Sequence, residues 1–202
     1  MRSTRRFSPR SSSRAPGYQR DDDREDPSVS LNDDEAGVIE VESESKTAEL
    51  DQVCMDAAMR FLAQRPRSEQ EIRRRLQIKG QDADRIDRIL VRLRESRLAN
   101  DHDFAQYWTE NRSQFKPRGD RALRSELFQK GVARDVIDTT LDQERDVVDD
   151  AYRAGLRRAI QLASLDERAF RERLKMFLMR RGFDWETIEQ ALKRLRAEST
   201  TA

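Results

Sequence analysis

The apolar positions of the chain follow helical spacing and then repeat as a set. Ile72 and Leu76 stand four residues apart, and so do Ile86 and Leu90. This spacing places both members of a pair on one helix face, so the segment predicts two amphipathic helices. The same pattern returns twice at a spacing of 51 residues, which marks an internal repeat. The three sets are Ile72, Leu76, Lys79, Gly80, Ile86 and Leu90; Leu123, Leu127, Lys130, Gly131, Ile137 and Leu141; and Leu174, Leu178, Arg181, Gly182, Ile188 and Leu192.

A glycine preceded by a base separates the two helices of every set. Gly80, Gly131 and Gly182 suit a helix end because glycine adopts the left-handed conformation without a Cβ clash. The base before each glycine suits the negative end of the helix dipole. Ser68 with Glu71, and Ser164 with Glu167, have the spacing of capping boxes that begin helices.

A further apolar helix precedes each pair, and no stretch alternates as a strand does. The pattern predicts an all-α fold of three tandem three-helix repeats of 51 residues. Repeats this small have little core of their own, so we expect them to stack into an elongated, curved array. The expected ranges are a disordered charged tail at 1–46, repeat 1 at 47–100, repeat 2 at 101–151 and repeat 3 at 152–199.

The expected tail is polar and its charges are segregated. An arginine- and serine-rich start without acids is followed by a strongly acidic segment, and apolar residues are sparse. So few apolar residues cannot bury enough surface to offset the conformational entropy that the chain would lose on folding. The start also resembles an organelle transit peptide, although only Phe7, Ala15 and Tyr18 could form its apolar face. A nucleic-acid-binding arm is a further alternative, and a solvated tail is the interpretation we favour.

Composition limits the class of protein. Charged residues make up 39% of the chain and hydrophobic residues 36%, which suits thin helical layers better than one large core. Because 40 Lys and Arg face 39 Asp and Glu, any electrostatic function depends on how the charges are distributed. A single cysteine and no long apolar run predict a cytoplasmic protein without a membrane interaction.

The sequence offers little for catalysis. His102, the only histidine, stands beside two aspartates at an expected helix start, where a solvated side chain is the ordinary outcome. Cys54 lies on an apolar helix face and is expected to be a buried structural thiol. No phosphate-binding glycine loop, zinc motif or calcium loop is present. We therefore predict no enzyme, no catalytic residue, no cofactor and no metal.

Many acids stand four residues before a base, as in ion pairs along one helix. These expected pairs are Glu69 and Arg73, Glu71 and Arg75, Asp84 and Arg88, Glu126 and Lys130, Glu167 and Arg171, and Glu189 and Lys193. Several bases, Arg180 among them, have no such acid. The candidate partner-binding residues are Arg74, Lys79, Arg112, Arg118, Arg121, Lys130 and Arg181, of which Lys130 is weakest because Glu126 precedes it by one turn. Phe104, Tyr107 and Trp108 could stack on bases, but their helical spacing favours core packing.

Four blocks of sequence together resemble the RecX regulatory proteins of bacteria. They are RPRSEQEIRRRLQIKG, LANDHDFAQYWTENR, RGDRALRSELFQKGVARDVID and FLMRRGFDWETIEQAL. The resemblance covers about residues 50–196. It implies three tandem three-helix repeats and a protein that binds RecA and its filament on single-stranded DNA, and that mostly inhibits recombinase, ATPase and SOS co-protease activities. The chain departs from the family at Arg97, where small residues are common, and at Asn100 and Asp101, where an acidic pair is common.

Two other functions remain open from the sequence. A direct DNA-binding protein could use tandem helix-turn-helix units, although its bases would then be expected on one strongly basic face. A general helical scaffold for another protein partner is the second alternative. We expect a monomer, with weak direct DNA binding as a possible addition to the contact with RecA.

Overall fold

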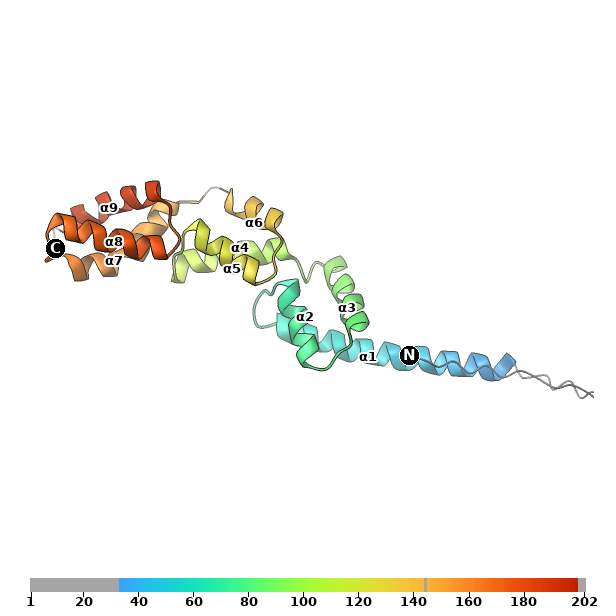
Figure 1. Cartoon of the computed structure of the whole chain (residues 1–202). Helices are drawn as coiled ribbons and strands as arrows, with labels where there is room; N and C mark the ends of the chain where they lie inside the picture. Colours follow the sequence, from blue (N-terminus) through green and yellow to red (C-terminus); the bar gives the residue numbers. More distant parts are fainter. Residues whose placement is uncertain (1–32, 144, 200–202) are drawn as a thin grey trace, which may run out of the picture. The chain divides into compact units, whose positions relative to one another are not determined.

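The computed structural model describes residues 33–143 and 145–199, with side chains described from residue 45 to residue 197. These residues form nine α-helices and no strand, as the sequence predicts (Figure 1). The helices are α1 (Asp33–Leu62), α2 (Glu69–Ile78), α3 (Ala83–Glu95), α4 (Asp101–Phe115), α5 (Asp120–Gln129), α6 (Arg134–Leu141), α7 (Val147–Leu162), α8 (Glu167–Arg180) and α9 (Trp185–Ser199). The chain divides into two units, residues 1–41 and 42–202, and every contact reported below lies in the second.

The N-terminal boundary of the helical region differs from the expected one. Residues 1–32 of the expected tail lie outside the described residues, but α1 begins at Asp33, so residues 33–46 are helical. The sequence of this segment opens with acids at residues 33–35, which suit a helix N-terminus. It also contains alanine and several glutamates, which favour helices even where apolar residues are few.

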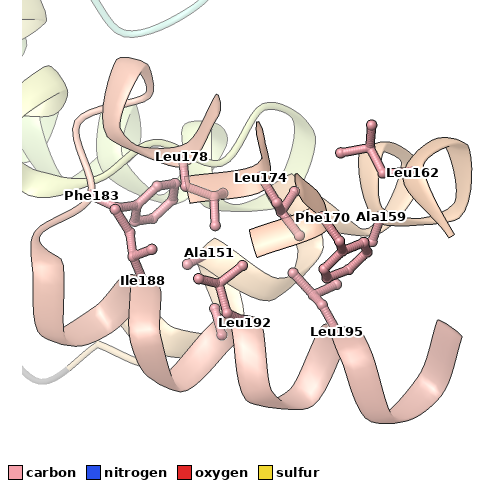
Figure 2. Close-up of a cluster of buried hydrophobic side chains, with 11 residues drawn as sticks. Ala151, Ala159, Leu162, Phe170, Leu174, Leu178, Phe183, Ile188, Leu192 and Leu195 are labelled. Atoms are coloured by element: carbon pink, nitrogen blue, oxygen red, sulfur yellow. The ribbon is translucent and has the colours of Figure 1, made fainter. Parts of the chain in front are cut away.

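The repeat register predicted from the apolar pattern is confirmed. All twelve apolar positions of the three sets are buried. They belong to three separate clusters, one for each group of three helices. Figure 2 shows the third cluster, in which Ala151 of α7 lies near Leu192 of α9, and Phe170 of α8 lies near Leu195 of α9. Each repeat therefore has its own core.

The three glycines end their helices in the same way. Gly80, Gly131 and Gly182 have φ of 76°, 83° and 87°, in the left-handed region that glycine favours. After α2, the backbone N–H of Gln81 donates to the Leu76 carbonyl at 3.1 Å, and the other two sites repeat this bond. This is the Schellman arrangement, and it turns the chain from the second helix of each repeat into the third.

Two local boundaries differ from the sequence prediction. The capping box of Ser164 and Glu167 is wrong, because Asp166 is the N-cap of α8 and accepts the Ala169 N–H at 2.9 Å. The expected boundary at residue 152 falls inside α7, whose N-cap is Asp146. The apolar pattern itself predicts one helix from about residue 144 to residue 163, and a boundary set by the fixed period divides it.

Polar contacts at helix ends join neighbouring repeats. At the first junction, the Ser68 hydroxyl before α2 donates to the Lys130 carbonyl after α5 at 2.6 Å. At the second, the Gly119 N–H before α5 donates to the Arg181 carbonyl after α8 at 3.0 Å. The donors stand one period apart, and so do the acceptors. The two junctions therefore use equivalent positions of the repeat. The elongated, curved form of the array stays a prediction.

Candidate partner-binding surface

The helix-surface ion pairs expected from the sequence are wrong. The structure pairs the same residues with partners outside the expected turn: Glu69 with Arg94, Arg88 with Asp51, Glu126 with Arg112, and Glu167 with Arg196. Arg171 and Glu189 also pair with each other, at 2.5 Å. The presence of an acid four residues earlier therefore does not predict which bases form ion pairs. Each candidate base must be judged by its surroundings in the fold.

Arg74, Lys79 and Arg121 are exposed and lack an ion pair with any described residue. Arg74 lies on α2, Lys79 is the C-cap of that helix, and Arg121 lies in the first turn of α5. Their guanidinium and ammonium groups remain available to an acidic or phosphate-bearing partner.

Lys130 and Arg112 have structural partners. The Lys130 ammonium lies 2.7 Å from Glu71 and 4.3 Å from the centre of the Trp108 ring. Arg112 lies 2.7 Å from Glu126, and its guanidinium also lies 4.3 Å from the Trp108 ring centre. These contacts place Lys130 in the first junction, between α2 and α5. Trp108 packs against the second core and donates to Glu126 at 2.9 Å, which supports core packing over a base-stacking platform.

Arg118, Arg121 and Arg181 come together at the second junction. The backbone N–H of Arg121 donates to the Gly182 carbonyl at 3.3 Å, beside the bond from Gly119 to Arg181. Burial lowers the pKa of the Arg181 guanidinium, and the positive charge of Arg118 lowers it further. Arg118 has one acidic neighbour, Glu126, at 3.7 Å. Three of the seven predicted residues thus form a basic junction, although Arg181 is far from Arg118 and Arg121 in the sequence.

Sequence reasoning missed a groove between α7 and α8. Its volume is about 340 Å³, and its walls include Arg157, Arg158, Arg180 and Arg181. Arg157 and Arg158 also lack an acid four residues earlier, so the criterion used for the other bases could have found them. We call this site the α7–α8 groove.

The residues with potential chemistry occupy ordinary structural positions. The Cys54 side chain is fully buried, and burial raises the pKa of its thiol. His102 lies in the first turn of α4, where its backbone N–H donates to the Asn100 side chain at 2.9 Å. Within residues 33–143 and 145–199, no group of histidine, cysteine and acidic side chains is arranged to hold a metal. None of the described helices combines the length and apolar character needed to cross a membrane.

Three family models match the chain in succession. They describe the first, second and third three-helix domains of RecX, and they cover residues 54–93, 100–141 and 144–192. The regulatory protein RecX of Chlorobium limicola is 34% identical over 138 residues, which are 68% of this chain and 86% of that protein. The regulatory protein RecX of Chlorobaculum tepidum is 35% identical over 148 residues, which are 72% of this chain and 90% of that protein.

A solved structure has the same fold. The crystal structure of RecX from Lactobacillus salivarius aligns with a TM-score of 0.67 at 20% identity. The alignment covers 74% of this chain and 99% of that one. The arrangement of three-helix domains is therefore shared with a protein whose sequence is largely different.

Proposed function

Because the chain belongs to the RecX family of regulatory proteins, we propose that it binds RecA and the RecA filament on single-stranded DNA. Binding mostly inhibits the recombinase, ATPase and SOS co-protease activities of RecA. The protein acts in the cytoplasm as a monomer, without a cofactor and without catalytic chemistry of its own. Its effect is then a shift in the stability of the filament.

The observation that carries the proposal is the presence of three matched domains, each with a core of its own. A filament presents the same protomer surface again and again. Tandem domains that each bind weakly to such a surface gain affinity, because the first contact raises the effective concentration of the next. A repeated regulator therefore suits a repeated partner.

The exposed bases are the candidate contacts with the filament. Arg74, Lys79 and Arg121 have no ion pair with a described residue to break before they bind, and Arg118 and Arg181 lie near Arg121 at the second junction. Lys130 and Arg112 are weaker candidates, since binding through them would cost their contacts with Glu71 and Glu126. We place the main contact at the second junction.

The proposal is tested by RecA ATP hydrolysis on single-stranded DNA, with this protein added well below the RecA concentration, at low and at moderate salt. We expect inhibition that persists at moderate salt, because the protein acts on the filament. Inhibition only at amounts that saturate the DNA, and lost steeply with salt, would favour direct DNA binding through helix-turn-helix units. Absence of inhibition would favour a scaffold for another partner.

The second junction is tested by the double variant Arg118→Glu/Arg121→Glu. We expect the concentration for half-inhibition of RecA to rise by roughly tenfold, which corresponds to about 1.4 kcal/mol of lost binding free energy. Arg60→Glu/Arg92→Glu is a control with the same charge change at exposed bases on α1 and α3. Circular dichroism checks that helix content is kept. Equal effects of the two double variants, or no effect of either, would remove this junction from the binding site.

A further inference from the structure

Each repeat has a loop at the position that forms the junctions, and the loop of repeat 1 is unused. At both junctions, the loop after the second helix of one repeat contacts the start of the second helix in the repeat before it. Among the described residues, no helix start lies against the loop of repeat 1. The three loops are Lys79–Gly80 after α2, Lys130–Gly131 after α5 and Arg181–Gly182 after α8.

The space around the three glycines shows which loops are covered. A Cβ added at Gly131 would overlap Gln70 at the start of α2. A Cβ added at Gly182 would overlap Ala122 at the start of α5. A Cβ added at Gly80 would meet no atom of the described residues within 4 Å. The loop after α2 is therefore an empty copy of a surface that is filled twice elsewhere in the chain.

The first helix of repeat 1 is exposed at the same surface. In repeat 2 the Lys130 ammonium lies 6.0 Å from the centre of the Phe104 ring, and Phe104 is 1% exposed. One period earlier, Val53 of α1 is 55% exposed, and Lys79 is exposed without an ion pair to any described residue. An apolar side chain and an ammonium group are thus open to solvent where repeat 2 covers their equivalents. We call Val53, Lys79 and Gly80 the open junction face.

The second junction shows what kind of element the open junction face accepts. The backbone N–H groups of Gly119 and Arg121 donate to carbonyls of the loop after α8. Ala122, the next residue of α5, packs against Gly182. The free N–H groups of a helix start complement the carbonyls and the negative dipole end of such a loop. A matching partner therefore presents a helix start with a small side chain.

The start of α8 has the same sequence pattern as the start of α5. The N-cap and the four residues after it read GDRAL at α5 and DERAF at α8, so both have an acid, an arginine, an alanine and an apolar residue in order. Residues 166–168 are exposed and Ala169 is half-buried, whereas Phe170 is the first residue of α8 in the third core. The first turn of α8 therefore extends beyond that core and is open to another molecule.

Charge also favours a contact between these two surfaces. Asp166, the N-cap of α8, has no ion pair with a described residue, and Glu167 beside it pairs with Arg196 at 2.8 Å. On the open junction face, the exposed Lys79 lacks an acidic partner among the described residues, and so does the nearby Arg74 of α2. Opposite charges on two surfaces increase the rate at which they associate and fix their orientation.

We propose that the open junction face binds the start of α8 of a second copy of the chain. Lys79 of one copy then lies beside Asp166 of the next, and Ala169 packs against Gly80. Because the two surfaces differ, the contact is head to tail, and each copy can bind one neighbour at each end. A contact as small as one junction is weak, so dilute chains stay monomeric. On a filament the high effective concentration of neighbouring copies would join them end to end, a consequence that rests on the proposed function.

The test is sedimentation equilibrium of the full chain without RecA, from about 10 µM to about 1 mM. We expect the weight-average mass to be that of a monomer at the lowest concentration and roughly twofold higher at the highest, for a dissociation constant near 1 mM. Val53→Asp should abolish this rise, because the new carboxylate neutralises Lys79 and repels Asp166 of the second copy. Val91→Asp, at a 43% exposed position on α3, is the matched control and should associate as the wild type does.

A second variant blocks the other end of the contact. Ala169→Arg places a long side chain where the alanine would pack against Gly80, so this variant alone should also stay monomeric. A mixture of Val53→Asp and Ala169→Arg should nevertheless form dimers and nothing larger, because one chain keeps the start of α8 and the other keeps the open junction face. Circular dichroism checks that both variants keep the helix content of the wild type.

Three results would overturn the proposal. A wild-type chain that stays monomeric at about 1 mM would leave the open junction face to a helix start of another protein. Association of Val53→Asp equal to that of the wild type would place the contact elsewhere. A mixture that stays monomeric while the wild type associates would mean that the contact is symmetric and not head to tail. Sparse amounts of both variants should still inhibit RecA, so a failure of this inference leaves the proposed function intact.

Discussion

Arg97 is the residue at which the backbone departs most clearly from the preference of its side chain. Its φ is 55°, the only positive value at a non-glycine position within the described residues. It follows Ser96, the C-cap of α3, and the next N–H, of Leu98, donates to the Leu93 carbonyl at 2.9 Å. This is the helix ending that glycine forms after α2, α5 and α8.

We expect Arg97→Gly to raise the free energy of unfolding by about 1 kcal/mol, because glycine adopts the left-handed conformation without a Cβ clash. Urea unfolding followed by circular dichroism measures the change. Ser96→Gly is the matched control, since φ at Ser96 is −83° and any residue adopts it. The control should lose about 0.5–1 kcal/mol through the greater freedom of the unfolded chain. Loss of stability in both variants would show that the Arg97 side chain compensates for its backbone.

At the scale of single helices, the second helix of each repeat connects the sequence pattern to the core. In α5, Leu123 and Leu127 are fully buried in the second cluster, while the adjacent Phe128 is 58% exposed. Burial therefore follows the period of the helix and not the size of the side chain. The register predicted from the apolar repeat depends on this distinction.

Leu127→Ala should lower the free energy of unfolding by about 2–5 kcal/mol, because the lost methyl groups leave a cavity in a small core. Phe128→Ala removes more atoms from the neighbouring position, but it should cost less than about 1 kcal/mol because that ring is largely in water. Chemical denaturation of both variants gives the comparison. A loss below about 0.5 kcal/mol for Leu127→Ala would contradict the register itself.

A second pattern becomes visible only when the helices are assembled. Arg73 pairs with Asp87 at 2.5 Å, and Arg124 pairs with Asp138, one period later in both members. These pairs join the second and third helices of a repeat. In the third repeat Glu189 takes the position of the acid and pairs with Arg171 at 2.5 Å, while Lys175, at the position of the base, lies 3.8 Å from the centre of the Trp185 ring. The repeat thus keeps an ion pair between its second and third helices while the base that forms it changes position.

The sequence predicted what local periodicity determines, and little of what depends on contacts between helices. Helices, glycine ends and core positions such as Leu127 could be read because one helix face is buried wherever apolar residues recur along it. The ion-pair partner of Glu126 could not be predicted from the sequence, because Arg112 lies on another helix. For the same reason the sequence could group Arg118 with Arg121 in one loop, but only the fold brings Arg181 to them.

At the scale of the whole molecule, the junctions determine whether three small domains behave as one protein. The first junction includes a half-buried ion pair between Glu71 and Lys130, and Arg65 also contacts Glu71, at 3.2 Å. Burial acts to raise the pKa of Glu71, but the hydrogen bonds from Lys130 and Arg65 outweigh it and hold the pKa below its ordinary value of 4.5. A carboxyl whose pKa falls on folding stabilises the folded state above its unfolded pKa. That contribution is lost as the pH falls through the folded pKa.

Glu71→Gln should therefore lower the free energy of unfolding by about 1–3 kcal/mol at pH 7, because Lys130 loses its anionic partner. The difference from the wild type should stay constant down to about pH 5 and narrow below it, as the wild-type carboxyl takes up a proton. Urea unfolding at a series of pH values measures both effects. Glu95→Gln, at an exposed site on α3, controls for the loss of one negative charge. A difference that did not change with pH would exclude the ion pair as its source.

The second junction is tested with two glycines that share a backbone conformation but differ in their neighbours. Gly80 and Gly182 have φ of 76° and 87°, so an alanine at either position should cost about 1 kcal/mol in backbone strain. A Cβ at Gly80 would meet no atom within 4 Å, whereas a Cβ at Gly182 would overlap the backbone and side chain of Ala122 at the start of α5.

We therefore expect Gly182→Ala to lower the free energy of unfolding by about 1–3 kcal/mol more than Gly80→Ala, because the added methyl group must push the second and third repeats apart. Urea unfolding of the two variants isolates the junction, since the backbone strain cancels between them. Gly182→Ala should also weaken inhibition of RecA if filament binding uses both repeats in a fixed arrangement, while Gly80→Ala should inhibit as the wild type does. Equal stability of the two variants would mean that α5 and the end of α8 do not stay in contact in solution, and the basic junction would then lose its structural basis.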